Sequence, residues 1–337
     1  MKTLHIFLLL FIFSLNSFGQ IWTKYHDLGI NESGFEINAL EDGNFLISGK
    51  EWGFPDFVSK YMFTKINPDG DVLWNKIYQL GSGGSSYVNI FTFPLSQNQG
   101  FYVIGNSYEF LTSDSYGDVF FLRMDENGDS LWTKIIGTPG AESLRSAFMT
   151  EDEEHFVFLH TSRDLNTSAT TTYLSKYGIN GDEIWMNEIG VNDPKIYYSL
   201  IPTPDGNFIA SGNYKWNNSN YDGLITKIDS DGNIIWEKKF GGVNRDFFFD
   251  VEINKKGNLF FFGSTNSLTP KGFWVLETDW DGNQLSEKTV PSPNGGILAA
   301  PHPRMEVLKL SDEGYIITTE YNLPGLTDDA QIYRLDP

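Results

Sequence analysis

The stretch ITKIDSDGNIIWEK, residues 225–238, decides the fold of this chain. In it an apolar run ends at Ile228, an Asp-Ser-Asp-Gly turn follows, and a second run carries Trp236 and Lys238. Asp-Gly between two alternating apolar runs is a strong hairpin signal, because these residues tolerate the positive φ that tight turns need. The stretch therefore predicts two antiparallel strands joined by a short polar turn.

The same string recurs along the chain. Copies with a tryptophan end at Lys76, Lys134 and Asn187, and a further copy ends at Lys288 with Ser286 in place of the tryptophan. A repeat of about fifty residues is typical of propellers and solenoids, because one unit cannot bury its own apolar face. We interpret the tryptophans as large structural wedges that pack between neighbouring units: Trp22, Trp74, Trp132, Trp185 and Trp236.

Each unit also holds an earlier strand that follows a short acidic turn, as in residues 43–49 and 206–212. Six copies of that strand predict six blades of four strands, with the tryptophan strand outermost. Residues 21–24 lack a hairpin partner, and residues 332–336 lack a following tryptophan strand, so pairing the two completes the sixth blade. The expected fold is all-β, a single β-propeller of about six four-stranded blades closed by its N-terminal and C-terminal strands. Residues 285–310 are the irregular segment on which the blade count depends.

The N-terminus reads as an export signal. Lys2 is followed by an apolar run from Leu4 to Phe13 and by a Ser-Phe-Gly ending at Gly19. That run is about ten residues long, whereas a membrane-spanning helix needs roughly 20. We therefore expect a signal peptide at residues 1–19, a β-propeller domain at residues 20–337, and no membrane insertion. The expected location is secreted, periplasmic or at the cell surface.

The chain is strongly acidic and free of cysteine. It carries 44 acidic and 24 basic residues, a formal net charge of −20. Such a surface repels phosphate backbones and anionic lipid heads, which disfavours nucleic-acid and membrane partners. Without disulfides the fold has to be stable from core burial or with a bound ion. We expect a monomer.

The repeat resembles known propeller signatures. Residues Asp229-x-x-Gly232-x-x-x-Trp236 are similar to the quinoprotein repeat with one residue fewer before the glycine, and to the sialidase Asp-box with one residue more after it. Nearly the whole chain after residue 19 more closely resembles exported repeat proteins of Bacteroidota-like bacteria, which have D-x-D-G-N-x-x-W-x-K units. The resemblance implies a propeller and little about activity, and the catalytic and cofactor residues of the first two families do not carry over.

Catalytic patterns are sparse, and no catalytic residue is predicted. No histidine lies in a metal-binding spacing, no G-x-S-x-G elbow occurs, and cysteine chemistry is impossible. The Asp-rich turns offer two carboxylates or one, whereas calcium takes six to eight oxygens, so we interpret them as hairpins, with calcium as the alternative and no cofactor or metal predicted. Recurrent basic residues before these turns are expected to pair with turn carboxylates: Lys65, Arg123, Lys176, Lys227 and Arg334.

The longer connections should all emerge on one face of the propeller, which we call the long-loop face. Exposed aromatics on loops of a rigid scaffold are suited to stacking on sugar rings or anchoring a protein partner, the alternative being that they cap the blades. The predicted ligand-binding residues are Trp52, Phe54, Tyr108, Tyr116, Tyr214, Trp216 and Tyr221.

The sequence leaves the function open between three readings. The first is a non-enzymatic extracellular or cell-envelope module that binds glycan or protein through the long-loop face. The second is a polysaccharide-acting enzyme, a glycoside hydrolase or lyase, with acids near the central channel. The third is a structural spacer in a surface complex. The absence of a catalytic motif favours the first.

Overall fold

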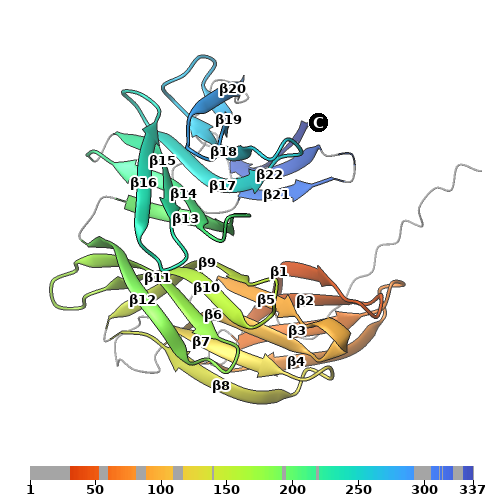
Figure 1. Cartoon of the computed structure of the whole chain (residues 1–337). Helices are drawn as coiled ribbons and strands as arrows, with labels where there is room; N and C mark the ends of the chain where they lie inside the picture. Colours follow the sequence, from red (N-terminus) through yellow and green to blue (C-terminus); the bar gives the residue numbers. More distant parts are fainter. Residues whose placement is uncertain are drawn as a thin grey trace, which may run out of the picture.

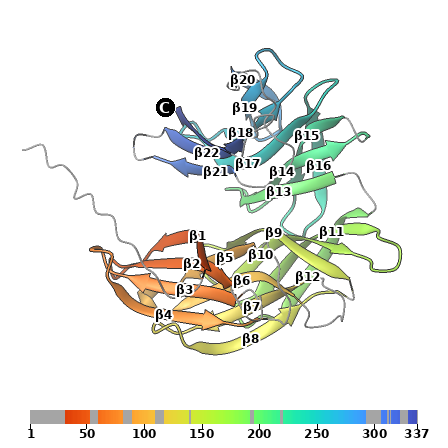
Figure 2. The ribbon, with the colours of Figure 1, turned by 180° about the vertical axis from the view of Figure 1, so that it is seen from behind.

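Six antiparallel sheets follow one another around a ring, which confirms the predicted six-bladed β-propeller (Figure 1). The view from behind shows the same order of blades (Figure 2). The structure is a computed structural model that describes residues 31–52, 60–80, 89–108, 117–138, 140–191, 195–217, 220–291, 305–310, 312, 314–321 and 329–336.

The strands are short and follow the chain order within every blade. Blades one to three are built from β1 (Asn31–Ala39), β2 (Phe45–Trp52), β3 (Lys60–Ile66), β4 (Val72–Tyr78), β5 (Ile90–Pro94), β6 (Phe101–Tyr108), β7 (Gly117–Met124), β8 (Ser130–Ile136), β9 (Ala141–Met149), β10 (His155–Arg163), β11 (Thr170–Gly178) and β12 (Glu183–Val191). Blades four to six are built from β13 (Lys195–Pro202), β14 (Phe208–Lys215), β15 (Tyr221–Ile228), β16 (Ile234–Phe240), β17 (Asp246–Ile253), β18 (Leu259–Thr265), β19 (Gly272–Thr278), β20 (Gln284–Pro291), β21 (Met305–Lys309), β22 (Tyr315–Tyr321) and β23 (Asp329–Leu335). One 3-10 turn, η1 (Ser96–Asn98), links β5 to β6.

The first strand of each blade is innermost, and successive inner strands lie against one another around the central channel. The tryptophan strand pairs with the strand before it, as predicted, so that Trp236 lies opposite Lys227 in the hairpin of β15 and β16. The sixth blade has three strands in the described part of the chain. Trp22 and the predicted closing strand at residues 21–24 lie outside the described residues, so closure by the two termini stays a prediction.

The Asp-Gly turns owe their shape to the aspartate side chain and to the glycine. Gly232 has φ 85° and its amide donates to the Asp229 carbonyl at 3.0 Å. Asp229 Oδ1 accepts the amides of Asp231 and Asn233 at 3.0 and 2.8 Å. These amide bonds lower the pKa of Asp229 although burial opposes them. The carboxylate therefore stabilises a hairpin turn, which is the role expected from the sequence, with calcium binding as the alternative.

The core is divided among the interfaces between blades. Alternate side chains of each strand point to opposite faces of the sheet, and each face is covered by a neighbouring blade. Phe121 of β7, for example, lies against Phe156 of β10 with ring centroids 5.0 Å apart. In the described part of the chain, five apolar clusters fill the five interfaces from blade one through blade six.

A repeated contact, which we call the interblade latch, joins each tryptophan strand to the turn of the next blade. A Cβ atom on Gly232 would lie 2.8 Å from the ring of Trp185, so only glycine fits beneath this indole. Asn187, two residues after the tryptophan, donates to the Asp231 carbonyl of the same turn at 2.5 Å. The other latches are Trp74 with Gly128, Trp132 with Gly181 and Trp236 with Gly282, and their polar arms are Lys76–Asp129, Lys134–Asp182 and Lys238–Asn283.

The basic residue of the third strand acts within its own blade. Lys65 pairs with Asp42 at 2.7 Å and Lys227 with Asp205 at 2.9 Å, each in the turn between the first two strands. Arg334 pairs with Asp312 in the same way. Arg123 departs from this prediction, because its guanidinium donates to backbone carbonyls, including that of Gln99 at 2.6 Å.

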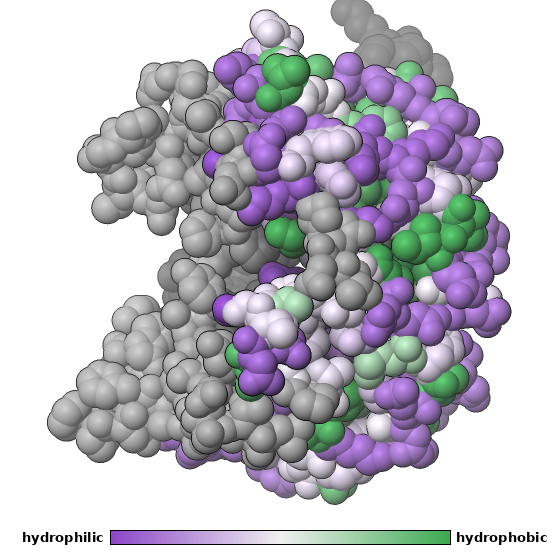
Figure 3. Space-filling model, turned by 90° about the vertical axis from the view of Figure 1, so that its left-hand side faces the viewer, coloured by the Kyte–Doolittle hydropathy of each residue, from purple (hydrophilic) through white to green (hydrophobic). Residues whose placement is uncertain are grey.

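The aliphatic residue before each latch tryptophan points away from the latch and is about half exposed: Leu73 51%, Leu131 57%, Ile184 51% and Ile235 50%. Leu285, at the same place before Ser286, is 51% exposed. The side that carries β12 and β16 is mostly polar, with apolar residues in separate patches (Figure 3). Scattered surface aliphatics of this kind are ordinary in soluble proteins. They provide control positions for substitution.

We predict that Gly232→Ala destabilises the protein more than Gly206→Ala does. Both glycines have a positive φ, +85° and +80°, so alanine costs about 1 kcal/mol of backbone strain at either position. Only Gly232 lies beneath a tryptophan, whereas nothing stands within 4 Å of a Cβ at Gly206. Overpacking should add about 1–3 kcal/mol to the cost of Gly232→Ala, measured as the free energy of unfolding in urea. Equal losses for the two variants would contradict the latch.

Candidate functional site

The topology places the turns inside hairpins on one face and the longer connections on the other. Loops between the second and third strands, and those between blades, therefore emerge together on the long-loop face. Trp52 and Tyr108 are the last residues of β2 and β6 at this face, and their side chains lie outside the described part, as do Phe54 and Tyr116 altogether. The structure places the other three predicted residues in blade four, where Tyr214 and Trp216 are in contact, whereas Tyr221 pairs with Lys215 and lies on the opposite face of the sheet from Tyr214.

We call Tyr214 and Trp216 the blade-four cluster; Tyr214 lies in β14, and Trp216 directly follows this strand. The rings of Tyr214 and Trp216 meet edge to face with centroids 4.8 Å apart. Trp216 Nε1 donates to Asp222 Oδ2 at 2.6 Å, and the residue is 53% exposed. The hydrogen bond fixes the indole while leaving half of its surface to solvent.

Lys239, on the outer strand β16, supplies a cation to the same cluster. Its Nζ lies 3.3 Å from the ring centre of Tyr214 and 4.6 Å from that of Trp216. Cation–π contacts of this kind contribute about 0.5–1 kcal/mol at exposed sites. Tyr214 therefore packs onto its own blade, as in the capping alternative, whereas Trp216 keeps an open surface.

Tyr221, the first residue of β15, lies on the other face of the blade and contacts the interior. Its ring has Arg245 at 5.7 Å and Lys215 at 6.0 Å on the outside, and Phe247 at 5.2 Å on the inside. Phe247 stacks on Phe249 at 5.9 Å, and Phe249 lies 5.7 Å from Tyr198. A continuous line of aromatic rings thus runs from the long-loop face to the inner strands.

Two pairs of acidic residues occupy equivalent places between blades at this face. Glu142 at the start of β9 and Asp118 at the start of β7 both approach Gly137, with oxygens 2.9 and 3.4 Å from the position that a Cβ there would take. Asp246 and Asp222 form the corresponding pair between blades four and five. In each pair one acid lies on a third strand and the other on the inner strand of the next blade.

The carboxylates of these pairs hold loops in place. Glu142 Oε1 accepts the amide and the hydroxyl of Thr138 at 2.9 and 2.6 Å. Asp246 accepts the Gly242 amide at 2.9 Å and the Thr265 hydroxyl at 2.6 Å. Because both equivalents fasten loops and Glu142 is buried, the arrangement fits a structural role better than acid–base catalysis. The sequence contains a pattern that could have indicated this arrangement, because Gly137 and Gly241 each lie five residues before an acidic residue.

Burial shifts the protonation of these acids. It raises the pKa of Glu142 to about 7, against the lowering effect of the Thr138 and Ser162 bonds, and the nearby charge of Asp118 adds to the rise. Burial also raises the pKa of Asp222, opposed by the Trp216 hydrogen bond.

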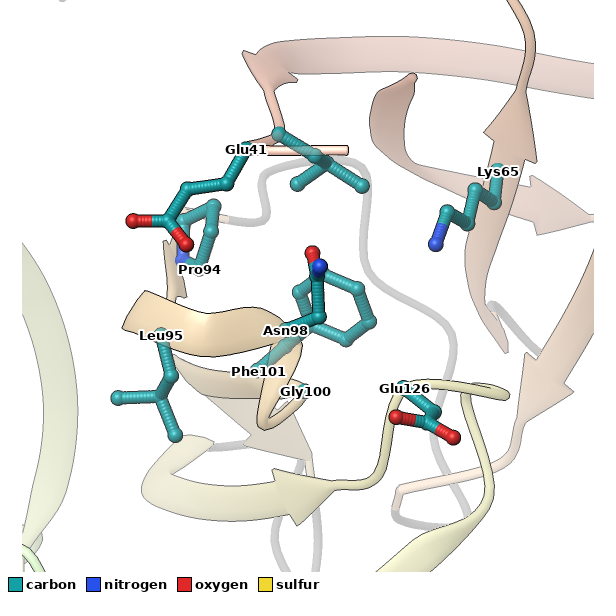
Figure 4. Close-up of a pocket in the computed structure, with 9 residues that line it drawn as sticks. Glu41, Lys65, Pro94, Leu95, Asn98, Gly100, Phe101 and Glu126 are labelled. Atoms are coloured by element: carbon teal, nitrogen blue, oxygen red, sulfur yellow. The ribbon is translucent and has the colours of Figure 1, made fainter. Parts of the chain in front are cut away.

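Two other groups of residues resemble binding sites, but their charged side chains bond to neighbouring groups of the protein. A small pocket opens between blades one and two on the turn face, with Glu41, Lys65 and Glu126 around it (Figure 4). Lys65 there pairs with Asp42, and Glu41 accepts the Gln97 amide at 2.7 Å. The cluster of Asp152, Glu154 and His155 has ligand atoms within 4.8 Å of one another. Asp152 Oδ1 in it accepts the Glu154 amide at 3.0 Å.

His160 occupies a place in β10 where the second strands of blades one, two, four and five carry glycine. Its Nε2 lies 2.9 Å from Ser175 Oγ, and its ring stacks on Tyr173 at 5.3 Å. Burial lowers its pKa to about 4, so it is neutral at physiological pH.

Within the described part of the chain, no helix has the length and apolarity needed to cross a membrane.

Comparisons with known proteins show the fold. No known family profile matches the chain, and no curated protein does. A protein of unknown function from Dyadobacter fermentans DSM 18053 superposes with a TM-score of 0.56 at 10% identity, over 93% of this chain and 96% of that one. A puromycin hydrolase superposes with a TM-score of 0.55 at 10% identity, and the match covers 85% of this chain and 43% of that one. Prolyl oligopeptidase B from Galerina marginata superposes with a TM-score of 0.50 at 10% identity, and the match covers 90% of this chain and 40% of that one.

We predict that Glu142 makes the stability fall as the pH rises. Its folded pKa of about 7 lies above the ordinary 4.5, so the folded state binds the extra proton between these values. The free energy of unfolding should therefore decrease from pH 4.5 to pH 7 and stay lower above it. Allowing for solvent screening, the loss is on the order of 1–3 kcal/mol.

Glu142→Gln should remove this part of the pH dependence, measured by urea unfolding between pH 4.5 and 8.5. Glu151→Gln, an exposed residue of the same blade, is the matched control and should follow the parent curve. If the Glu142→Gln curve runs parallel to the parent over the whole range, the carboxyl does not titrate as described.

Proposed function

We propose that this protein is a non-enzymatic, exported carbohydrate-binding module whose ligand lies on the blade-four cluster. The observation that carries the proposal is Trp216, an indole held by Asp222 and still 53% exposed beside Lys239. A large aromatic side chain is normally buried on folding, so one fixed in an open position at the end of a strand favours a ligand contact.

Carbohydrate suits this surface better than an apolar partner. The C–H face of a pyranose ring can stack on the free part of the indole, while its hydroxyls need charged and polar groups close by. Asp222 and Lys239 supply such groups beside Trp216.

The local charge narrows the ligand further. Lys239 lies on the cluster, and Lys215 and Arg245 lie on the Tyr221 ring at the other face of the same blade, in a protein whose net charge is −20. A cationic patch on an acidic protein attracts anionic ligands locally, although the field of the whole molecule repels polyanions. We therefore propose that the preferred ligands are oligosaccharides with isolated acidic sugars. Neutral chains and densely charged chains should bind more weakly.

The enzyme alternative draws less support from the long-loop face. The described acid pairs there hold loops with their carboxylates, as Glu142 does for Thr138 and Asp246 for Gly242. Binding, without turnover, at the cell envelope or outside the cell is the function proposed.

We predict that Trp216→Ala weakens glycan binding about tenfold or more, because truncating a central aromatic contact commonly costs above 1 kcal/mol. The measurement is an array of neutral and uronate-containing oligosaccharides, followed by titration calorimetry on the strongest one. Leu131→Ala, a half-exposed aliphatic on the outer strand of blade two, is the control and should bind as the parent does.

Three results would count against the proposal. Unchanged affinity of Trp216→Ala would move the site away from blade four. Release of reducing sugar from a bound polysaccharide would favour the enzyme. A parent protein that binds no glycan on the array would favour a spacer or a protein partner.

A further inference from the structure

Three successive inner strands carry an extra residue at the same place. The pairing register shifts between residues 144 and 146 in β9, between 197 and 199 in β13, and between 248 and 250 in β17. Such β-bulges leave one residue unpaired and re-aim its side chain. The unpaired residues are Arg145, Tyr198 and Phe249.

The preceding residue of each bulge belongs to an interblade core, since Leu144, Tyr197 and Phe248 are all fully buried. The bulged side chains themselves are partly buried and lie on the strands that surround the central channel. Tyr198 and Phe249 are in contact, with ring centroids 5.7 Å apart. Arg145 and Tyr198 are coupled electrostatically, because the guanidinium acts to lower the pKa of the phenol.

Arg145 is a partly buried cation for which the described residues supply no counter-charge. Its Nε has no accessible surface and no hydrogen-bond partner, and among the described residues the guanidinium forms no ion pair. Burial lowers its pKa, yet arginine stays protonated in proteins. Two carboxylates of other inner strands have partners of their own: Asp250 accepts the Ser199 hydroxyl at 2.7 Å and Glu36 accepts the Thr92 amide at 2.9 Å.

A buried donor without an acceptor is destabilising, so the Arg145 Nε calls for a partner. We propose that Arg145 anchors a carboxylate-binding site in the central channel, with the Tyr198 hydroxyl as a second donor and the Tyr198 and Phe249 rings as its apolar wall. The guanidinium fork matches a planar carboxylate through two parallel hydrogen bonds. Burial raises the pKa of Tyr198 to about 12, so its hydroxyl keeps the proton that it would donate.

The surroundings favour a monoanion with a ring or apolar body. A dianion such as phosphate meets the repulsion of a molecule with net charge −20. The aromatic wall continues outward through Phe247 to Tyr221, so a flat body attached to the carboxylate has rings to lie against. The ligand class is therefore a small aromatic or cyclic monocarboxylic acid. This site is distinct from the blade-four cluster and does not depend on glycan binding there.

The test uses the full chain with sodium benzoate, and with inorganic phosphate as the competing oxyanion. Binding is followed by titration calorimetry and by ligand-observed NMR. Benzoate should bind saturably and phosphate far more weakly. Arg145→Met should weaken benzoate binding about tenfold or more, and Tyr198→Phe by a smaller factor, because the charged fork contributes more than one neutral donor. Leu131→Ala should bind benzoate as the parent does.

Stability distinguishes a binding residue from a structural one. Without ligand, Arg145→Met should unfold at the same urea concentration as the parent or a higher one, because it removes a partly buried charge and its unsatisfied buried Nε donor. A large loss of stability in Arg145→Met would assign the arginine to the fold and overturn the proposal. So would equal benzoate affinity in parent and Arg145→Met, or phosphate binding as tight as benzoate.

Discussion

The contact between a tryptophan of one blade and the turn glycine of the next is the constraint on which this propeller depends. At Gly232 a side chain as small as a methyl group would meet the Trp185 ring at 2.8 Å. The glycine thus serves the hairpin, through its positive φ, and the interface, through its missing side chain. Trp185 and Asn187 lie two residues apart on one face of β12, so the indole and the polar arm reach the same turn.

This contact explains why the repeat looks as it does in the sequence. The Asp-x-Asp-Gly-Asn turn and the Trp-x-Lys strand are adjacent in the chain, but each latches to a different neighbour, one blade before and one blade after. The recurring string therefore records an interface between units. Because the apolar clusters also lie between blades, the stability of each blade depends on its neighbours, as in other repeat proteins.

Strands, turns and blade count were predictable because they follow from local patterns repeated many times. Grouping aromatics on one face was predictable in the same way, and it found Tyr214, Trp216 and Tyr221. Lys239 was not found, since it lies on an outer strand and reaches the cluster only through the packing of β16 against β15. The proximity of Asp118 and Glu142 was missed because the two residues belong to different blades. A glycine five residues before Glu142, and another five residues before Asp246, could have indicated that the two acids occupy equivalent places.

Arg145 could not be identified from the sequence at all. Nothing in the run from Ala141 to Met149 separates an arginine in a bulge from one on an exposed strand, because a bulge is set by the register with the neighbouring strand.

The bulges of the inner strands give the fold a set of exchangeable positions. A bulged residue takes no part in the strand ladder, and the residue before it stays in the core whatever its neighbour is. Arginine, tyrosine and phenylalanine already occupy equivalent bulges in blades three, four and five, on one unchanged backbone plan. A ring of this kind can acquire a new lining for its channel, one side chain at a time, while the parts that hold it together stay as they are.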